Sequence, residues 1–593
     1  MEPAVTASSN NLILSELRMQ DDNLEIGLNI VTKMEAEDAK KRQDTDITYG
    51  IDDNPPWYLC VFMALQHYLT MIGAIVSIPF ILTPAICMKD DDPARSHIIC
   101  TMIFVTGIVT WVQATFGCRL PIVQGGTISF LVPTLAILNL PQWRCPEPAV
   151  LDAMTSDNRT ELWQTRMREL SGAIAVSAVL QAVIGLFGIV GVILRYVTPL
   201  TIVPTVSLVG LSLFENAADS ASQHWGIAAG TILMLTAFSQ LLREVHVPLL
   251  AYKRDVGFSI VWFQLFKLFP VLLTIIIMWG VCALLTLSGN LPVGHPARTD
   301  VKLRIIEDSP WFRFPYPGQW GVPTVTAAGV LGMLAGVLAC TVESISYYPT
   351  TARMCGAPPP PVHAINRGIA IEGIGTILAG LWGSGNGTNT FGENVGAIGV
   401  TKIGSRRVIQ YAAVLMIIQG LISKFGAAFI IIPQPVVGGM FCIMFGMITA
   451  FGLSALQYVD LNSSRNLYIV GFSIFFSLVL SKWMEANPHA IQTGSEVVDS
   501  IITVLLSTSI LIGGITGCLC DNIIPGTPEE RGLIAWQDQM KLEPNKENGD
   551  ASDTYDYPIG MSVIRRLNIF SYLPFMPTYK QEKWMLCGAK RNL

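Results

Sequence analysis

Long apolar runs separated by short polar stretches make up most of this chain. Five of the runs have about the 20 residues that a helix needs to cross the hydrocarbon core of a bilayer. They cover 57–83, 97–117, 171–194, 264–287 and 466–484. Counting the shorter apolar runs as well gives about 14 segments. We therefore predict an all-α protein that passes through a membrane many times.

Glycine, proline and polar residues interrupt three of the predicted segments, at 121–140, 198–214 and 388–400. Two interruptions fall at matching places in the two halves: Gln-Gly-Gly-Thr-Ile-Ser-Phe at 124–130, and Thr-Phe-Gly-Glu-Asn-Val-Gly at 390–396. With seven segments in each half, the halves must have opposite orientations. We predict two inverted repeats with short, broken segments 3 and 10.

Broken spans leave backbone N–H and C=O groups unpaired, so they must face protein, substrate or a watery cavity. Matched interruptions in two halves of a transporter indicate its substrate site. The alternative is that Gly125, Gly126 and Gly392 only let helices pack closely, as small residues do in membranes. We prefer this packing role for Gly332 and Gly336, which lie in an otherwise regular segment.

Composition agrees with a membrane protein and excludes several other classes. Hydrophobic residues make up 51% of the chain and charged residues 14%, against roughly 25% charged in soluble domains. The chain has no Walker motif, HExxH, GxSxG or paired CxxC, which are signatures of enzymes and metal sites. We expect no catalytic residues, no cofactor and no nucleic-acid partner. The polar residues 1–50 do not resemble a cleavable signal peptide.

Basic residues fall in alternate loops, which the positive-inside rule places in the cytoplasm together with both termini. They are Arg119, Arg195, Arg243, Lys253, Arg254, Arg353, Arg367, Lys402, Arg406, Arg407 and Arg465. The opposite loops, 141–170 and 288–320, are then external, and we expect a glycan on Asn158. The sequons at Asn386 and Asn462 are interpreted as chance matches. A disulfide between Cys87 and Cys145 is left open.

Few charged side chains lie within the predicted spans, and each costs several kcal/mol there unless it is paired or hydrated. Glu343 and Glu393 are our candidates for substrate binding. Glu372 is either functional, or it has a structural role in which it pairs with Arg367 or caps a helix. His67 either forms a buried structural hydrogen bond or contacts substrate or ion, and the sequence favours neither role over the other.

Two half-helices that meet inside the membrane direct their N-terminal N–H groups at one small volume. Carboxylates beside these donors suit a neutral planar ligand with alternating N–H and C=O groups, such as uracil or a purine base. A negative charge about 4 Å from one carboxylate costs about 4 kcal/mol at an effective dielectric of about 20. The two glutamates therefore disfavour an anionic substrate without excluding it.

Several motifs resemble the nucleobase/ascorbate transporters, solute carrier family 23. The resemblance covers 55–560 and rests on Gln66-His67, Glu343-Ser344-Ile345, the stretch 357–366 (APPPPVHAIN) and the stretch 393–402 (ENVGAIGVTK). The last stretch matches the family signature of Gln, Glu or Pro followed by Asn-x-Gly-x4-Thr and usually a basic residue.

The resemblance implies a core domain (55–194 and 321–432) that moves like an elevator against a gate domain (195–320 and 433–524). The gate would also form a homodimer, and cytoplasmic tails at 1–54 and 525–593 would flank the whole. The resemblance also implies that further residues bind substrate. It implies that Gln66 and His67 support the pocket. The added residues are Phe391, Gly392, Asn394, Gly126, Thr127, Ile128 and Ser129.

The first signature position bears on the substrate. In the family that this chain resembles, animal ascorbate carriers have Pro at this position and nucleobase carriers have Glu or Gln. This chain has Glu393. We therefore expect a nucleobase importer in the plasma membrane. Sodium is the expected coupling ion, because the stretch 357–366 and Pro55-Pro56-Trp57 resemble the animal sodium-coupled members of the family. Sodium-coupled relatives usually have Asp where this chain has Tyr347. A sodium-dependent ascorbate carrier and an uncoupled facilitator or substrate sensor remain alternatives.

Overall fold

The structure is a computed structural model that describes residues 47–191, 197–253, 257–534 and 553–579. Several sequence-based expectations fall outside these ranges. They concern the N-terminal tail up to residue 46, residues 535–552 and 580–593 of the C-terminal tail, and the basic residues Arg195 and Arg254.

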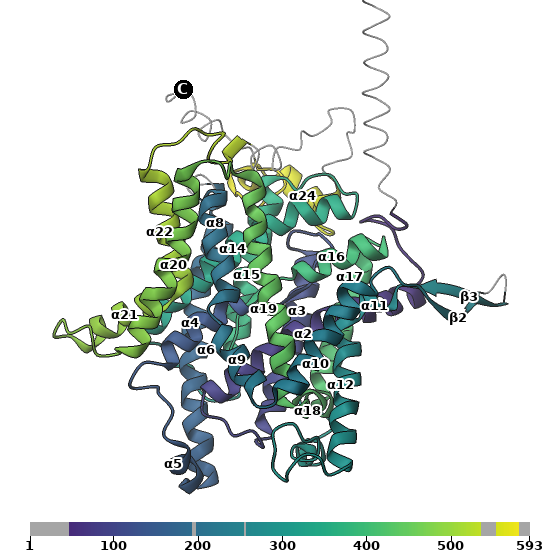
Figure 1. The fold of residues 1–593 in the computed structure, drawn as a ribbon. Helices are drawn as coiled ribbons and strands as arrows, with labels where there is room; N and C mark the ends of the chain where they lie inside the picture. Colours follow the sequence, from purple (N-terminus) through teal and green to yellow (C-terminus); the bar gives the residue numbers. More distant parts are fainter. Residues whose placement is uncertain (1–46, 192–196, 254–256, 535–552, 580–593) are drawn as a thin grey trace, which may run out of the picture.

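Helices dominate both halves of the described chain (Figure 1). The first half contains α2 (Trp57–Ala85), α3 (Ala94–Thr115), β1 (Gln124–Gly126), η1 (Ile128–Phe130), α4 (Leu131–Leu138), α5 (Pro148–Ala153), α6 (Ser156–Leu186), α8 (Pro199–Leu211), α9 (Phe214–Ser222), α10 (Trp225–Thr236), η2 (Ala237–Leu241), β2 (Val247–Lys253), β3 (Gly257–Phe263), α11 (Leu265–Leu268) and α12 (Pro270–Leu287).

The second half follows with α13 (Leu303–Asp308), α14 (Ala327–Met354), α15 (Val362–Leu381), β4 (Thr388–Thr390), α16 (Gly392–Thr401), α17 (Arg406–Leu421), α18 (Ser423–Ile430), α19 (Gln434–Ser454), η3 (Ala455–Tyr458), α20 (Ser464–Ala486), α21 (Glu496–Ser507), α22 (Ser509–Ile523), η4 (Asp553–Tyr555), α24 (Met561–Arg566) and η5 (Asn568–Tyr572).

Nine of the described helices are long and apolar enough to cross a membrane. The pair α21 and α22, bent by 74° at Thr508, adds a tenth if it counts as one span. Shorter apolar helices cover Ile128–Leu138 and Trp225–Leu241. The prediction of an all-helical, multi-pass membrane protein is confirmed, while the count of fourteen segments stays a prediction.

Local sequence explains where several helices begin. Pro199 is the first residue of α8 and Pro270 the first of α12, positions where the missing proline N–H has no helical partner in any case. Thr326 precedes α14 and its hydroxyl accepts a hydrogen bond from the Gly329 N–H. Ser463 caps α20 in the same way by accepting from the Asn466 N–H. Such caps satisfy the first N–H groups of a helix.

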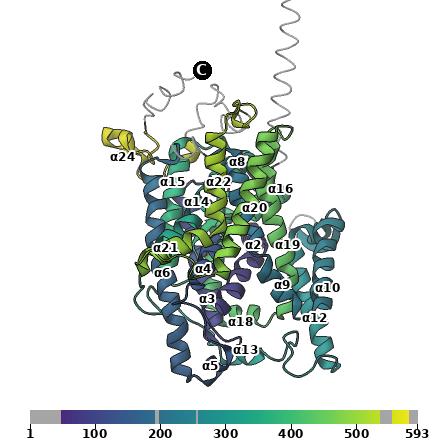
Figure 2. The ribbon, with the colours of Figure 1, turned by 60° about the vertical axis from the view of Figure 1, so that its left-hand side comes forward.

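The spanning helices pack mostly within two sets. The first set comprises α2, α3, α4, α6 and α14 to α18, and the second comprises α8 to α12 and α19 to α22. Helix α14 touches both sets, because it packs on α6 and α4 and also reaches α21, α22 and α8. Figures 1 and 2 place α24 at one end of these helices and α5 at the other.

The two interrupted segments meet inside the first set. Strand β1 pairs with β4 in an antiparallel ladder that joins Gln124 to Thr390 and Gly126 to Thr388. A Cβ on Gly125 would lie 2.2 Å from Cε2 of Phe391, so only glycine allows the two segments to approach this closely. The ladder pairs the backbone groups that the broken helices leave free, as membrane burial requires.

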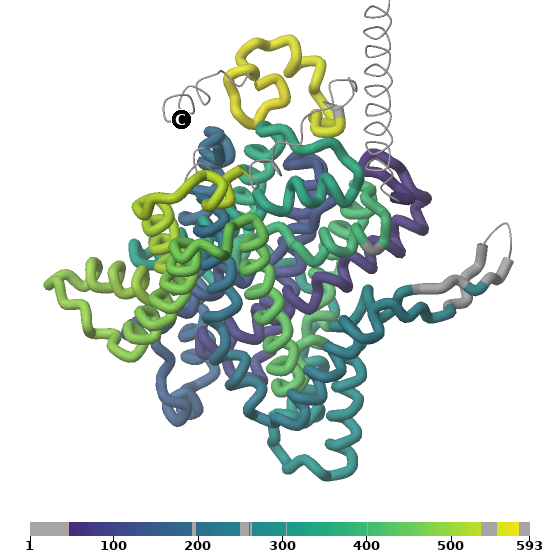
Figure 3. The backbone as a smooth tube through the Cα atoms, turned by 45° about the horizontal axis from the view of Figure 1, so that its top comes forward, coloured from purple at the N-terminus to yellow at the C-terminus, as the bar shows by residue number. Residues whose placement is uncertain are grey.

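The C-terminal segment 553–579 lies across one end of the first set (Figure 3). Tyr555 is fully buried, its hydroxyl donates to the Pro358 carbonyl, and its own carbonyl accepts from Nη2 of Arg367. The Asn366 amide donates to the Pro574 carbonyl at 3.1 Å. Part of the C-terminal tail that the resemblance implies at 525–593 is therefore docked on the helices.

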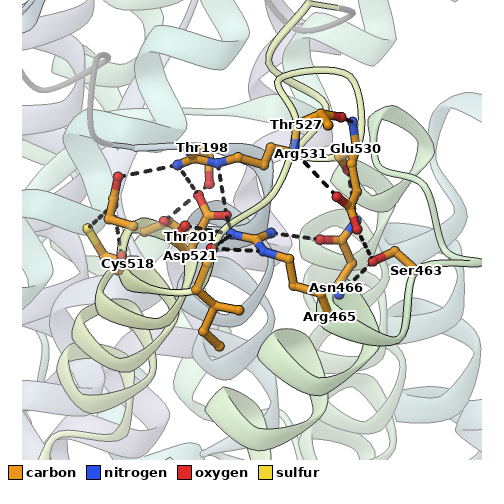
Figure 4. Close-up of polar contacts among 12 residues, drawn as sticks. Thr198, Thr201, Ser463, Arg465, Asn466, Cys518, Asp521, Thr527, Glu530 and Arg531 are labelled. Atoms are coloured by element: carbon orange, nitrogen blue, oxygen red, sulfur yellow. Dashed lines mark hydrogen bonds and ion pairs between the residues drawn. The ribbon is translucent and has the colours of Figure 1, made fainter. Parts of the chain in front are cut away.

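A buried charged cluster holds the same end of the second set together (Figure 4). Asp521, at the end of α22, accepts from Nη2 of Arg465 at 2.8 Å and from Nη2 of Arg531 at 2.7 Å. The Asp521 side chain is inaccessible to solvent, so the two guanidinium groups compensate a charge that would otherwise be costly to bury. This cluster fixes α20, α22 and the following turn relative to each other.

Cysteines Cys87 and Cys145 form a disulfide, which settles the pairing left open by the sequence. The bond ties the end of α2 to the segment between α4 and α5, at the end of the helices opposite α24. Asn158 is exposed in the first turn of α6, near α5. Glycosylation of Asn158 stays a prediction.

Candidate substrate site

Glu343 lies in the middle of α14, opposite the paired strands. Its Oε2 accepts a hydrogen bond of 2.6 Å from Nδ2 of Asn389 in β4, and its Oε1 accepts one of 3.4 Å from the Tyr347 hydroxyl. Gly336 lets α14 come this close, because a Cβ there would lie 3.1 Å from the Ser129 carbonyl oxygen. Gly336 therefore has the packing role predicted for it, and the close approach of α14 brings the Glu343 carboxylate to the broken segments.

A chain of hydrogen bonds links Glu343 to a second buried carboxylate. The Ser344 hydroxyl lies 2.7 Å from Oε1 of Glu372 and 2.5 Å from Oδ1 of Asn389. The Tyr348 hydroxyl donates to Oε2 of Glu372 at 3.1 Å. Glu372 is thus held by hydroxyl groups and is completely buried. Pairing with Arg367 is wrong, because that guanidinium binds the carbonyls of Gly117 and Tyr555.

Glu393 occupies the first turn of α16, directly after β4. Its side chain is exposed, while its neighbours Phe391 and Asn394 are buried. Glu393 and Glu343 are close enough for their charges to repel each other. The position at the start of a helix suits a carboxylate, because the N-terminal end carries partial positive charge.

A cavity of about 360 Å³ lies between the two helix sets and reaches Glu343 and Gly392. Its walls come from α14 and α16 on one side and from α8, α19 and η3 on the other. The remaining lining residues include Tyr347, Arg353, Val395, Gly396, Phe451 and Tyr458. The cavity extends along α14 toward Arg353, at the end where Pro358 meets the docked C-terminal segment.

Tyr347 is placed where the two helix sets meet. Its ring stacks on Phe451 of α19 with a centroid separation of 5.1 Å and an interplanar angle of 22°. Its hydroxyl also packs against Gly392, where a Cβ would lie only 2.4 Å away. Tyr347 therefore touches Glu343, the start of α16 and the second helix set at once, while a role in ion coupling stays a prediction.

Residues 126–129 lie buried behind Glu343. The Thr127 N–H donates to Oδ1 of Asn386 at 2.9 Å, and the Thr127 hydroxyl accepts from the Ser129 N–H at 3.2 Å. Ile128 packs in the main apolar cluster together with Phe391. The side chain of Ser129 interacts with Glu343. Ser129 is thus the member of this stretch that the structure brings to a candidate carboxylate.

Asn394 and His67 join α16 to α2. The Asn394 side-chain amide donates to the His67 carbonyl at 2.8 Å and lies 3.3 Å from Nδ1 of the ring. Both residues are buried, which favours the structural hydrogen bond over direct substrate contact for His67. Gln66 is buried too, and its side-chain amide forms no hydrogen bond with any described residue.

Three carboxylates, Glu343, Glu372 and Glu393, therefore lie in one region of the first helix set, and Arg353 is the cationic side chain in the lining of the adjoining cavity. Within the described ranges, none of Glu343, Glu372 and Glu393 forms an ion pair with Lys, Arg or His. Charges buried in a membrane protein need compensation by partners, water, protons or bound cations. The site can supply hydrogen-bond acceptors to a ligand, and it attracts cations.

Sequence reasoning overlooked two residues that complete the site. Asn389 bridges Glu343 and Ser344, and the signal was available as a polar residue inside an interrupted apolar segment. Phe451 contributes from a distant, regular apolar helix, where nothing in the local pattern distinguishes it from residues that face lipid.

Apolar spanning helices, a pair of broken segments and an internal cavity are typical of a membrane transporter. A model of the xanthine/uracil permease family, described as "Permease family", matches residues 60–486. The chain belongs to this family and, within it, to the nucleobase-ascorbate transporters of solute carrier family 23.

Relatives match over nearly the whole chain. Solute carrier family 23 member 2 of the mouse is 47% identical over 93% of this chain and 85% of its own. Member 1 of the rat is 48% identical over 90% and 89%. Nucleobase-ascorbate transporter 1 of Arabidopsis thaliana is 35% identical over 87% and 96%. The transmembrane domain of a cyanobacterial bicarbonate transporter, BicA, is 13% identical over 76% and 96%, with a TM-score of 0.41.

Proposed function

We propose that this protein imports a nucleobase of the uracil or purine type, coupled to sodium. The observation that carries the proposal is the Glu343 carboxylate, which opens on a cavity of about 360 Å³ without a cationic partner in the described chain. A cavity of this size falls in the range of roughly 300–1,000 Å³ found for small-molecule sites.

Carboxylate chemistry supports a base over an acid as the substrate. An ionised carboxylate accepts hydrogen bonds, so it can bind the ring N–H groups that alternate with C=O groups on the edge of uracil or a purine base. Glu343 and Glu393 together offer acceptors only. An anion beside Glu343 would meet the charge of this carboxylate, at a cost of about 4 kcal/mol at about 4 Å and an effective dielectric of about 20, whereas Arg353 lines another part of the cavity.

Uptake of labelled uracil and xanthine in cells that express the protein tests this proposal. Glu393→Ala and Glu343→Gln should each abolish uptake, while surface biotinylation shows normal amounts of protein. Glu496→Gln, which changes an exposed carboxylate at the start of α21, is the matched control and should transport normally. Undiminished uptake in Glu393→Ala would contradict the assignment of the site.

Sodium coupling rests on the excess of carboxylates around the site. A bound cation would offset the repulsion between Glu343 and Glu393, and substrate would then bind more tightly. Replacing sodium by choline should therefore lower uptake at limiting substrate. Counterflow that persists without sodium-dependent accumulation would instead favour an uncoupled facilitator or a substrate sensor.

Ascorbate is the second candidate substrate, and one observation favours it. The relatives from Arabidopsis thaliana are named nucleobase-ascorbate transporters, and these names include both substrates. Uptake of labelled ascorbate that excess uracil, hypoxanthine or xanthine does not reduce would establish this alternative.

Transport would follow from movement of the first helix set against the second, because the cavity lies between them. We propose an elevator-like movement in the plasma membrane, with both termini in the cytoplasm and a homodimer formed through the second set. Residues 52 and 554 both contact Arg406, which supports placing the two ends of the described chain on one side. Crosslinking of exposed cysteines introduced in α20 would test the dimer.

A further inference from the structure

A second cavity, of about 160 Å³, lies at the end of the first helix set where the two terminal segments meet. Residues 51–54 and Pro558 form part of its wall, and Arg119, Arg406, Arg407 and Gln410 form most of the rest. It shares no lining residue with the cavity beside Glu343. Three arginines around so small a space repel one another unless negative groups compensate their charges.

Arg406 is fully engaged by the protein itself. Its Nη1 binds Oδ1 of Asp52 at 2.8 Å, its Nε donates to the Arg119 carbonyl at 2.8 Å, and its Nη2 donates to the Thr554 carbonyl at 3.0 Å. Asp53 is occupied as well, because its Oδ2 accepts from the Gly50 N–H at 2.7 Å. Of the two acids at this cavity, Asp52 is therefore paired with Arg406, and in the described part of the chain neither forms an ion pair with Arg119 or Arg407.

Arg119 and Arg407 have no such compensation. Neither forms an ion pair with any residue in the part of the chain that the structure describes, and the Arg119 Nε is buried without a hydrogen-bond partner there. Arg119 also has a backbone φ of 59°, which lies in the left-handed region that residues other than glycine rarely adopt. The chain thus holds a guanidinium group at this cavity at a conformational cost.

Positive charges around Arg119 also indicate that its guanidinium group lacks full compensation. Partial burial, together with the positive charges of Arg406 and Arg367, lowers the pKa of Arg119 to about 10, and Asp52 and Asp556 offset only part of this effect. An anion in the cavity would remove that repulsion. The start of α17 at Arg406 adds the partial positive charge of a helix N-terminus to the same place.

We propose that this cavity is a binding site for a phosphate-bearing anion, held by the Arg119 and Arg407 guanidinium groups. Guanidinium groups bind phosphate oxygens through paired, charge-assisted hydrogen bonds, which makes phosphate the ligand that suits two free arginines best. A bound phosphate would join the segment before α2, the docked C-terminal segment and the start of α17.

The phosphate has two possible sources, an anionic lipid headgroup or a soluble phosphate compound. Trp57 and Tyr58, which begin α2 shortly after the cavity-lining residue Asn54, are 70% and 63% exposed. Exposed Trp and Tyr at the end of a spanning helix are typical of the headgroup level of a bilayer. A lipid headgroup could therefore reach the cavity from the membrane, while a soluble anion could enter from the aqueous side.

Binding of labelled inositol 1,4,5-trisphosphate to the purified full-length protein tests the site. We expect saturable binding that Arg119→Gln and Arg407→Gln each weaken about tenfold, since each removes one charge-assisted contact. Arg119→Lys should weaken it less, because the charge remains. Arg566→Gln is the matched control, since it removes the same charge from an exposed position in α24 and should bind as the unmodified protein does.

Arg407 is exposed, so Arg407→Gln decides the question even if Arg119→Gln fails to fold. Absence of saturable binding, or equal affinity in all four variants, would overturn the proposal. Competition by inorganic phosphate and by vesicles containing phosphatidylinositol 4,5-bisphosphate separates the sources. Either competitor acting through Arg407 supports the site, with vesicles alone indicating a lipid headgroup and inorganic phosphate indicating a soluble ligand.

Discussion

The ring of Tyr347 in the first helix set stacks on the ring of Phe451 in the second, with 5.1 Å between centroids. Aromatic pairs of this kind contribute about 0.5–1.5 kcal/mol beyond the area that they bury. The stack closes one wall of the cavity beside Glu343. It is therefore a contact that any movement of one set past the other has to break.

Phe451→Ala should destabilise the conformation described here by about 1 kcal/mol, because the ring contact is lost. We expect a lower thermal unfolding midpoint in detergent and a changed maximal rate of uptake. Phe451→Tyr retains the ring and is the control for size. An unchanged midpoint and rate in Phe451→Ala would show that the stack has no energetic role.

Gly392→Ala should abolish or strongly reduce uptake, because the new Cβ would lie 2.4 Å from the Tyr347 hydroxyl oxygen. Either Tyr347 or the first turn of α16 would then have to move, and Glu393 with it. Gly471→Ala in α20 is the control, since a Cβ there meets no atom within 4 Å. Normal uptake by Gly392→Ala would mean that this close approach is dispensable.

The docked C-terminal segment gives a prediction about stability. Tyr555→Ala removes a fully buried ring and its hydrogen bond to the Pro358 carbonyl, and we expect a loss of about 3 kcal/mol. The measurement is the thermal unfolding midpoint of the purified protein. Tyr572→Ala, at a position 76% exposed, should leave the midpoint unchanged. Equal midpoints for both variants would contradict the docking.

Lys302, between α12 and α14, predicts a dependence of stability on pH. Burial, reinforced by the charge of Arg95, lowers the pKa of Lys302 to about 8, although Asp90 acts in the opposite direction. The folded protein then binds fewer protons than the unfolded chain between about pH 8 and the unfolded pKa of 10.5. Stability should rise with pH in this window, and the cost of burying the charge is fully present below about pH 8.

Lys302→Met should remove this cost and stabilise the protein by up to about 3 kcal/mol at pH 7. The unfolding midpoint of this variant should also change less than that of the unmodified protein between pH 8 and pH 10. Lys402→Met, at an exposed position, is the control. A midpoint at pH 7 that does not rise in Lys302→Met would show that the ammonium group is already well solvated.

Much of the site could be predicted from local sequence. Hydrophobic length indicated the spans, glycines and polar residues indicated the two interruptions, and the cost of burying charge singled out Glu343, Glu372 and Glu393. The partners of these carboxylates could not be predicted. Asn389 donates a hydrogen bond to Glu343, which is 46 residues away in the sequence. Arg367 binds the carbonyl of Tyr555, 188 residues away, instead of pairing with Glu372.

The sequence by itself therefore determined the class of protein, the broken segments and the positions of the carboxylates. These features depend on periodicity, residue size and charge within short stretches, which are properties of local sequence. Only the tertiary structure decided which groups meet: Tyr347 with Phe451, the terminal segments with Arg406, and β1 with β4. Such meetings depend on how distant helices pack against each other, and no local pattern encodes that packing.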